Sequence, residues 1–153
     1  MKPTFHLGIW LLLVIGAATL FSCKKDPTKS RTELLTTGTW KRAALTSNPA
    51  YDWYNNGTSN TDILSYMWPC EKDDFETYRT NGMLEINEGP TKCDPAADQT
   101  WSLTWAFIKN ETVILFEGTF ECIIDELTET TLKFHGTFEE NGVMYTHYET
   151  WVH

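Results

Sequence analysis

Beyond Ser30 the chain alternates apolar and polar residues with a period of two, which predicts β-strands. The clearest case is residues 100–108, where every second residue is large and apolar in the centre of the segment. Turn signals separate such segments, and Asn81-Gly82 and Asn141-Gly142 are dipeptides typical of tight hairpins. The pattern predicts eight strands, at residues 38–45, 74–79, 83–87, 100–108, 112–116, 119–125, 130–138 and 143–152.

Helical signals are few. Residues 32–35 form a predicted helical turn before the first strand, and Thr61-Asp62 can cap a short helix over residues 62–67 that Pro69 ends. Residues 48–60 are rich in Asn, Gly and Pro, so we expect a long loop there. A meander of eight antiparallel strands has two exposed edges, and closure into a barrel removes both. The sequence therefore predicts an all-β fold, an eight-stranded antiparallel meander barrel with a short helix between strands 1 and 2.

The start of the chain has a different pattern, that of an export signal. Lys2 is positive, residues 7–20 are almost wholly apolar, and a span this short matches a cleavable signal better than a membrane helix. The run ends in Leu20-Phe21-Ser22-Cys23, which resembles the lipobox read by lipoprotein signal peptidase. The resemblance implies a diacylglyceryl thioether on Cys23, cleavage before it, and acylation of the new amino terminus, with palmitate as the expected lipid. The alternative is an ordinary secretory signal with a chance cysteine.

This interpretation divides the chain into a signal peptide (1–22), a lipidated tether (23–30) and a β-barrel domain (31–153). Several acyl chains give a lasting membrane anchor where one chain does not. Lys24 resembles the residue that follows the cysteine in outer-membrane lipoproteins. We therefore expect the protein to be held in the outer membrane by lipid on Cys23, on either its periplasmic or its cell-surface face.

Charge and missing motifs narrow the function classes. The formal net charge is −9, and an acidic chain without a basic patch is a poor candidate for nucleic acid binding, which depends on neutralising phosphates. The sequence contains no Gly-x-Ser-x-Gly motif, no Gly-rich phosphate loop and no Walker lysine. We therefore expect no nucleic acid partner, no cofactor, no catalytic residues and no enzymatic activity.

Three cysteines remain in the expected exported domain, where disulfides are permitted. Cys70 and Cys93 lie beside prolines and acids in loop-like sequence, whereas Cys122 lies within a predicted strand. We expect a Cys70–Cys93 disulfide, which stabilises by about 3 kcal/mol on the chain-entropy model, and a buried thiol at Cys122. No Cys-x-x-Cys pair occurs and the histidines are distant in sequence, so we expect no zinc site.

Histidines and acids offer two further metal candidates. His135 and His147 lie on neighbouring predicted strands, but no third ligand accompanies them, so we predict no metal there. If the disulfide forms, five acids gather near one rim of the barrel, where they either hold calcium or, as we favour, cap turns and keep the rim soluble. These acids are Glu71, Asp73, Asp74, Asp94 and Asp98.

Several segments resemble the lipocalin-like domain of Gram-negative bacterial lipoproteins. Gly38-Thr39-Trp40 is similar to the lipocalin Gly-x-Trp signature, and an acidic run bracketed by cysteines resembles the family more specifically. The resemblance covers residues 34–152 and implies a barrel, with small-molecule binding assumed in the family by analogy. The other segments that carry it are residues 70–74, 88–89, 92–94, 100–103 and 127–132.

Aromatic residues make up 14% of the chain, which fits a barrel filled with rings or, less commonly, an aromatic-lined pocket. Our first functional hypothesis is a non-enzymatic binder of a small apolar or aromatic molecule, with the helix at residues 62–67, Trp53 and Tyr54 as a lid. The alternative is a structural or interaction lipoprotein whose filled barrel contacts a protein or a glycan. The candidate barrel-lining residues are Trp40, Tyr78, Trp101, Leu103, Phe116, Phe134 and Tyr148.

Overall fold

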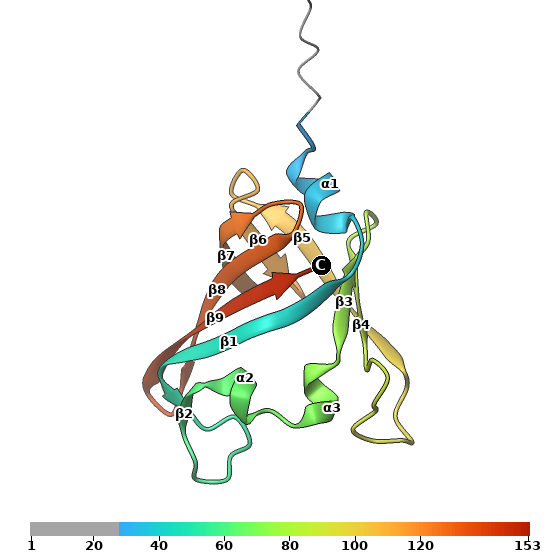
Figure 1. The fold of residues 1–153 in the computed structure, drawn as a ribbon. Helices are drawn as coiled ribbons and strands as arrows, with labels where there is room; N and C mark the ends of the chain where they lie inside the picture. Colours follow the sequence, from blue (N-terminus) through green and yellow to red (C-terminus); the bar gives the residue numbers. More distant parts are fainter. Residues whose placement is uncertain (1–27) are drawn as a thin grey trace, which may run out of the picture.

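The computed structural model describes residues 28–153. The predicted signal peptide, Cys23 and most of the predicted tether lie outside the described residues. Within them, nine antiparallel strands form one sheet, and eight of the strands close into a barrel because β1 also pairs with β9 (Figure 1). The strands are β1 (Trp40–Tyr51), β2 (Asn60–Asp62), β3 (Phe75–Tyr78), β4 (Met83–Asn87), β5 (Thr100–Ile108), β6 (Val113–Phe116), β7 (Phe120–Leu127), β8 (Thr131–Glu140) and β9 (Val143–Val152).

The predicted fold class, an eight-stranded antiparallel meander barrel, is confirmed. Strands β4, β5 and β9 have the bounds expected from the sequence, whereas β1 continues to Tyr51 instead of ending at residue 45. The far half of β1 pairs with β9 as far as Asn48 opposite Thr146, and it also pairs with the short β2. The expected loop therefore begins later, because neighbouring strands satisfy the backbone groups of a polar segment that has no strand pattern of its own.

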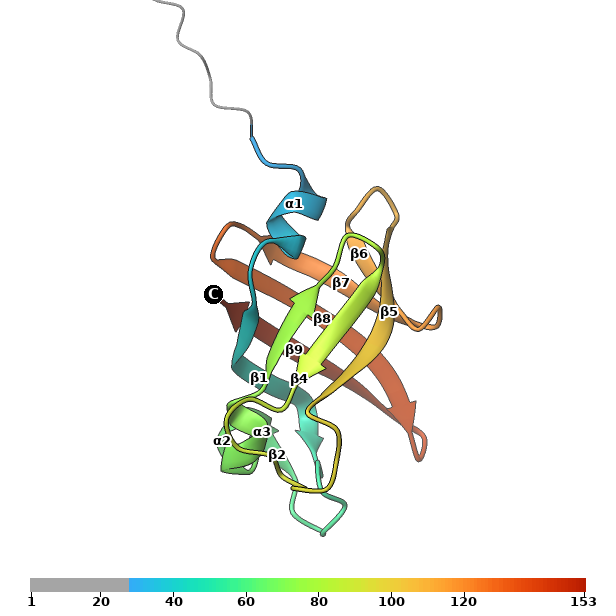
Figure 2. The ribbon, with the colours of Figure 1, turned by 90° about the vertical axis from the view of Figure 1, so that its right-hand side faces the viewer.

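One end of the barrel is closed by α1 (Arg31–Thr36), which lies across it in Figure 2. A capping box begins this helix, since Ser30 and Glu33 each accept a hydrogen bond from the other's backbone N–H. Leu35 is fully buried, and its carbonyl oxygen accepts a 2.9 Å hydrogen bond from Nε1 of Trp40. The predicted helical turn is thus fixed to the first strand by both packing and a hydrogen bond.

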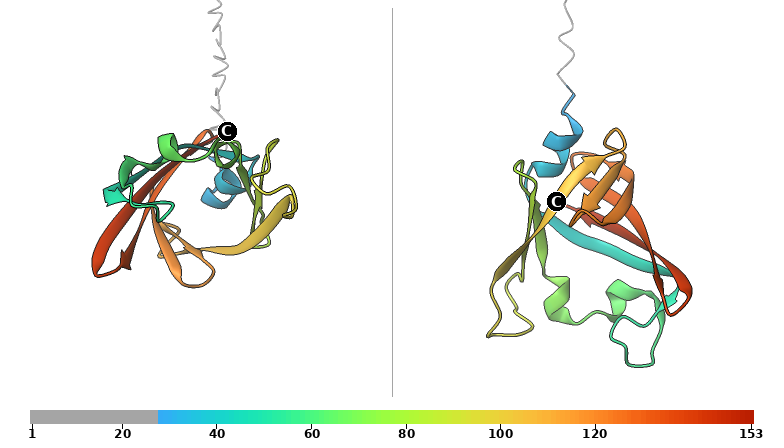
Figure 3. Two further views of the ribbon diagram at one scale, coloured as in Figure 1. Left: turned by 90° about the horizontal axis from the view of Figure 1, so that it is seen from below. Right: turned by 180° about the vertical axis from the view of Figure 1, so that it is seen from behind.

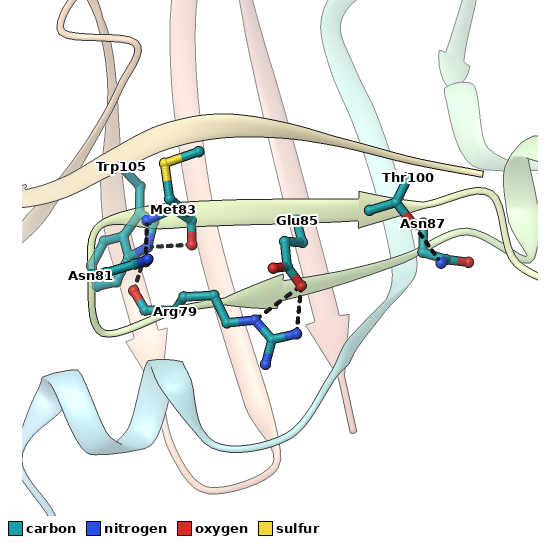
Figure 4. Close-up of polar contacts among 7 residues, drawn as sticks. All are labelled: Arg79, Asn81, Met83, Glu85, Asn87, Thr100 and Trp105. Atoms are coloured by element: carbon teal, nitrogen blue, oxygen red, sulfur yellow. Dashed lines mark hydrogen bonds and ion pairs between the residues drawn. The ribbon is translucent and has the colours of Figure 1, made fainter. Parts of the chain in front are cut away.

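The main hydrophobic core lies beside α1, and the β3–β4 hairpin holds one of its large rings. Nε1 of Trp105 donates to the carbonyl oxygens of Arg79 and Met83, at 3.2 and 3.1 Å (Figure 4). Oδ1 of Asn81 accepts a 3.1 Å hydrogen bond from the backbone N of Met83, which orders the hairpin predicted at this position. The buried members of this core include Leu35, Trp40, Tyr78, Leu84, Trp105, Ile114, Leu132 and Phe134.

The opposite end of the barrel carries α2 (Ile63–Tyr66), α3 (Pro69–Lys72) and the long β4–β5 loop (Figure 3). Asp62 caps α2 as predicted, accepting a 3.0 Å hydrogen bond from the backbone N of Ser65. Pro69 follows α2, and it also begins α3, because proline has no N–H to donate and suits a first helical turn. No helix in residues 28–153 is long and apolar enough to span a membrane.

Two attachments hold the β1–β3 connection at this end. The Cys70–Cys93 disulfide joins α3 to the β4–β5 loop, as predicted, with the two Cα atoms 5.2 Å apart. A second small core of Leu45, Ile63 and Met67 packs α2 against β1. The segment between β1 and β3 is therefore a fixed part of the fold at the end of the barrel opposite α1.

Candidate ligand-binding site

Two cavities of about 300 Å³ each lie inside the barrel. They share Arg42, Glu76 and Trp151 as lining residues, so they meet where β1, β3 and β9 face the interior. No residue of α1 lines either cavity. A volume of this size lies at the lower end of the range found for small-molecule binding sites, so the barrel interior is the candidate site.

The two cavities differ in chemistry. The first, which we call the apolar cavity, is lined mainly by inward side chains of β4 to β8: Leu84, Leu103, Phe116, Phe120, Cys122 and Phe134. The second, which we call the acidic cavity, lies beside α3 and the disulfide. Its walls combine rings, sulfur and carboxylates, chiefly Trp53, Met67, Trp101, Glu71, Asp74 and Glu88.

Four of the seven predicted lining residues lie at these cavities. Leu103, Phe116 and Phe134 line the apolar cavity, and Trp101 lines the acidic one. On β5, the alternation predicted from the sequence directs Trp101 and Leu103 to the same side of the strand. The period of two therefore identified the inward face of this strand correctly.

The other three predicted lining residues lie elsewhere. Trp40 and Tyr78 are fully buried members of the main core and line neither cavity. The prediction for Tyr148 is wrong: its side chain is 45% exposed and lies against the ring of His135. Glu149 and Trp151 take the inward positions of β9, and successive strand residues point to opposite faces.

An ion pair crosses the junction of the two cavities. Nε of Arg42 lies 3.1 Å from Oε2 of Glu149, and Nε1 of Trp151 donates to the same oxygen at 3.1 Å. The guanidinium carbon of Arg42 is 4.5 Å from the centre of the Trp151 ring, a cation–π contact. The positive charge of Arg42 is thus already matched by a carboxylate and an aromatic face.

Glu76 is the most deeply buried carboxyl group at this junction, with 8% of the residue exposed. Arg42 makes its salt bridge to Glu149 and none to Glu76. Within the described residues, Glu76 accepts one hydrogen bond, from the hydroxyl of Tyr78 at 3.3 Å. Burial and, to a smaller extent, the charge of Glu149 raise the pKa of Glu76 to about 8, against the opposing effect of Arg42.

A second perturbed carboxyl group lines the acidic cavity. Burial raises the pKa of Asp74 to about 6, and the nearby charges of Glu88 and Asp73 act in the same direction. Oδ1 of Asp74 is buried and accepts no hydrogen bond from residues 28–153. The acidic cavity therefore carries more negative charge than its walls neutralise.

Sequence reasoning missed Arg42, Glu76 and Glu149 as interior residues. A signal was present for two of them, because Arg42 and Glu76 each lie two positions from a ring that the sequence analysis placed inside, Trp40 and Tyr78. Glu149 was missed because Tyr148, its neighbour on β9, was expected to face the interior, which would place Glu149 on the outer face. Charged residues at inward positions of a strand were the clue to a polar site in the barrel.

Residues 28–153 contain no cluster of three or more His, Cys, Asp or Glu side chains that could hold a metal ion. His135 and His147 lie on opposite faces of the sheet. Nδ1 of His135 is 2.9 Å from Asp125 on the outside, whereas His147 packs inward against the ring of Tyr51, and its burial lowers its pKa. Glu71 and Asp74 from the predicted acidic rim do line the acidic cavity, but Asp94 and Asp98 do not.

Cys122 is a buried free thiol, as predicted, and burial raises its pKa to about 12. Gly136 lies opposite it on β8. A Cβ atom at this glycine would come within 2.8 Å of the Phe120 ring and 3.1 Å of the Cys122 sulfur. The glycine therefore makes room for the wall of the apolar cavity, and the buried thiol is part of that wall rather than a nucleophile.

A third hollow, of about 370 Å³, lies on the outer face of the β3–β4 hairpin and is lined mostly by threonines and other polar residues. Figure 4 shows Arg79 paired with Glu85 and the amide of Asn87 donating to the hydroxyl of Thr100. These partners satisfy one another at the surface. The hollow therefore offers fewer free groups to a ligand than the interior does.

No protein-family model and no curated protein matches this chain. The resemblance to lipocalin-like lipoproteins thus stays a prediction from the sequence. The functional argument rests on the barrel, its two cavities and the charges at their junction.

Proposed function

We propose that this protein is a membrane-anchored lipoprotein of lipocalin-like type, whose barrel binds a small apolar or aromatic molecule without catalysing a reaction. The observation that carries the proposal is the pair of cavities that meet at Arg42, Glu76 and Trp151. An eight-stranded barrel has room for one small ligand, and a barrel packed to both ends would lack this space.

The walls support an apolar or aromatic ligand. Phe116, Phe134 and Leu103 form a hydrophobic side, where burying apolar ligand surface is favourable by about 25 cal/mol per Å². Trp53, one of the residues predicted to act as a lid, lines the acidic cavity and packs against the second core near Met67. A ligand in this space would be enclosed by rings on several sides and oriented by the charged junction.

The proposed lipid anchor gives the site an orientation. The described chain leads into α1 at the closed end of the barrel (Figure 1). If Cys23 carries the lipid, only a short segment separates the membrane from α1, so the closed end faces the membrane. The cavities and the disulfide-linked end then face away from it, accessible to a ligand in solution.

Native mass spectrometry of the protein purified from its own cells and released in mild detergent tests ligand binding. We expect an additional mass that disappears on denaturation. A bare chain that also fails to bind a panel of apolar and aromatic compounds would contradict the proposal. The same sample, denatured and digested, tests the anchor, because an amino-terminal peptide without acyl mass on Cys23 would refute the lipoprotein assignment.

A second candidate function is supported by a separate surface. Tyr54, Asn56, Tyr66 and Trp68 line a hollow of about 350 Å³ beside α2 and α3, and the ring of Trp68 is stacked on Tyr54 with 57% of the residue exposed. Such a surface suits contact with a protein or a glycan. Trp68→Ala would then abolish retention of the protein on its partner while ligand binding in the barrel is unchanged, whereas loss of neither activity would exclude this candidate.

A further inference from the structure

We propose that the ligand of this barrel is a small organic cation, an amine with an aromatic or apolar body, whose ammonium group pairs with Glu76 at the junction of the cavities. The inference rests on the proposed function and specifies its ligand class. Four observations carry it: the unpaired buried carboxyl, the occupied arginine, the surplus of acids and the aromatic walls.

Glu76 is the group at the junction that lacks a charged partner. It is buried, lines both cavities, and accepts one weak hydrogen bond from Tyr78 and no salt bridge within the described residues. A buried carboxylate is strongly disfavoured unless a positive charge or several hydrogen bonds compensate it. An ammonium group at the junction would supply both the charge and the donors.

Arg42 does not fill this role. Its guanidinium is held between Glu149 and the face of Trp151, and the same Glu149 oxygen is also bonded to the Trp151 indole. Moving Arg42 to Glu76 would leave Glu149 half-buried without its partner. A positive charge that pairs with the ionised form of Glu76 therefore has to come from outside the barrel.

The remaining charges favour a cation over an anion. Among residues 28–153, Arg42 is the only basic residue that lines either cavity, against six carboxylates. Asp74 contributes a buried oxygen with no hydrogen bond from the described residues. An anionic ligand would face these like charges in a poorly solvated space, which costs several kcal/mol in close contacts. The carboxylates are Glu71, Asp74, Glu76, Glu88, Glu117 and Glu149.

The aromatic walls suit the same ligand. Trp53, Trp101 and Trp151 line the acidic cavity. Indole faces attract cations, and aromatic side chains are commonly used to recognise ammonium ligands. The apolar cavity next to the junction, with Phe116 and Phe134, has space for the uncharged body of the ligand.

Binding of a cation at Glu76 should release a proton. Arg42, Glu149, Asp74, Tyr78 and Cys122 are the titratable groups that face or perturb Glu76 from β1, β9, β3 and β7. In the free protein the raised pKa, about 8, keeps much of Glu76 protonated near neutral pH. An ammonium ligand favours the carboxylate, so its affinity should rise with pH through this range.

The test compares matched probes by isothermal titration calorimetry on the protein freed of retained ligand. Tryptamine is compared with tryptophol, and phenethylamine with 2-phenylethanol, since each alcohol replaces the ammonium by a hydroxyl. At about pH 7 we expect the better amine to bind at least about tenfold more tightly than its alcohol, the ratio typical of a charge-assisted hydrogen bond. Repeating the titration in buffers of different ionisation enthalpy measures the released proton.

Two variants with the same change in charge locate the effect. Glu76→Gln should remove both the preference for the amine and the proton release, so that the amine then binds no more tightly than its alcohol. Glu121→Gln is the control, because Glu121 pairs with Lys109 on the outer face and lines neither cavity. We expect Glu121→Gln to behave as the unaltered protein does.

The outcomes separate the two proposals. Alcohols that bind as tightly as amines, or an unchanged preference in Glu76→Gln, would overturn the cation inference and leave the binding function standing. If no probe binds, the retained molecule from native mass spectrometry decides: a cationic one supports the inference and a neutral or anionic one overturns it. No probe binding and no retained molecule would overturn both proposals.

Discussion

The two halves of this barrel differ in their interior: one is packed with large side chains and the other is hollow and carries charged residues. In the half beside α1, Trp40, Tyr78 and Trp105 pack into a dense core. In the half beyond them, the inward positions carry Arg42 and Glu76 and the interior is hollow. A closed barrel holds both because β1, β3 and β9 run through the two halves, and the inward face of each changes character along its length.

On three strands, a ring and a charged residue occupy neighbouring inward positions, two residues apart. On β1 the inward Trp40 is followed by Arg42, and on β3 the inward Tyr78 is preceded by Glu76. On β9, Trp151 is preceded by Glu149. The rings in one half stabilise the fold. The charged residues inside the other half do not favour stability, which marks that half as the candidate functional site. The difference teaches that the packed core and the proposed binding site occupy different layers of one barrel.

The largest expected effect is the loss of a ring from the core half. Trp40→Ala should lower the free energy of unfolding by about 3–5 kcal/mol, because it leaves a cavity and an unpaired carbonyl at Leu35. Chemical denaturation followed by circular dichroism measures this. Tyr148→Ala is the matched control on the outer surface, where we expect a loss below about 1 kcal/mol. Equal losses would mean that the core half does not dominate stability.

The next effect concerns the disulfide at the hollow half. Cys70→Ser/Cys93→Ser should lower the free energy of unfolding by about 3 kcal/mol, because the unfolded chain regains the freedom of a closed loop. Urea denaturation with and without a reductant measures the loss. Reductant should lower the free energy of unfolding of the unaltered protein by about the same amount as the double substitution does. It should leave the double variant unchanged. A reductant effect of the same size in the double variant would contradict this assignment.

Removing the interior positive charge has a smaller expected effect. Arg42→Met should cost about 2 kcal/mol, because Glu149 then stays half-buried without its partner. Adding Glu149→Gln to this variant should restore part of the loss in thermal and chemical unfolding. Arg79→Met is the outer control: its pair with Glu85 is solvent-exposed, so we expect no measurable change. If Arg79→Met lowered the free energy of unfolding as much as Arg42→Met does, the inner ion pair would be no more important for stability than the outer one, which would contradict the prediction.

Taken per pH unit, the smallest effect is a pH dependence from Glu76. Its pKa is about 8 in the folded protein against 4.5 as the ordinary value, so the folded state holds the proton more tightly. Its contribution to stability therefore falls as the pH rises from about 4.5 to about 8. Relative to the unaltered protein, Glu76→Gln should gain at most about 1.4 kcal/mol per pH unit across this window. Unfolding curves of both proteins at several pH values measure the difference, and parallel pH profiles would contradict it.

Local patterns were sufficient to predict the fold. The period of two set the bounds of β4, β5 and β9, and Asn81-Gly82 and Asn141-Gly142 placed two hairpins correctly. The Cys70–Cys93 pairing followed from the loop-like sequence around both residues. These features depend on neighbours along the chain, which is why a single sequence carries them.

The site needed more than local pattern. Tyr148 was assigned to the wrong face, because a shift of one residue in a strand reverses every side chain and the pattern of β9 is weakly alternating. In β1 the register shifts between Arg42 and Ala44, a bulge that no turn signal marks. Glu76 was not recognised as an interior residue, because its burial depends on what the other strands place around it.

The sequence by itself determined the eight strands of the barrel, but not β2 or the far half of β1, together with the tight turns and which cysteines pair, because hydrophobic alternation and turn chemistry act over a few residues. Only the tertiary structure decided that Arg42, Glu76 and Glu149 meet at one point between two cavities. These residues come from β1, β3 and β9, and β9 lies about a hundred residues from β1 along the chain. Closure of the barrel brings the three strands together. It creates both the cavities and the burial that raises the pKa of Glu76.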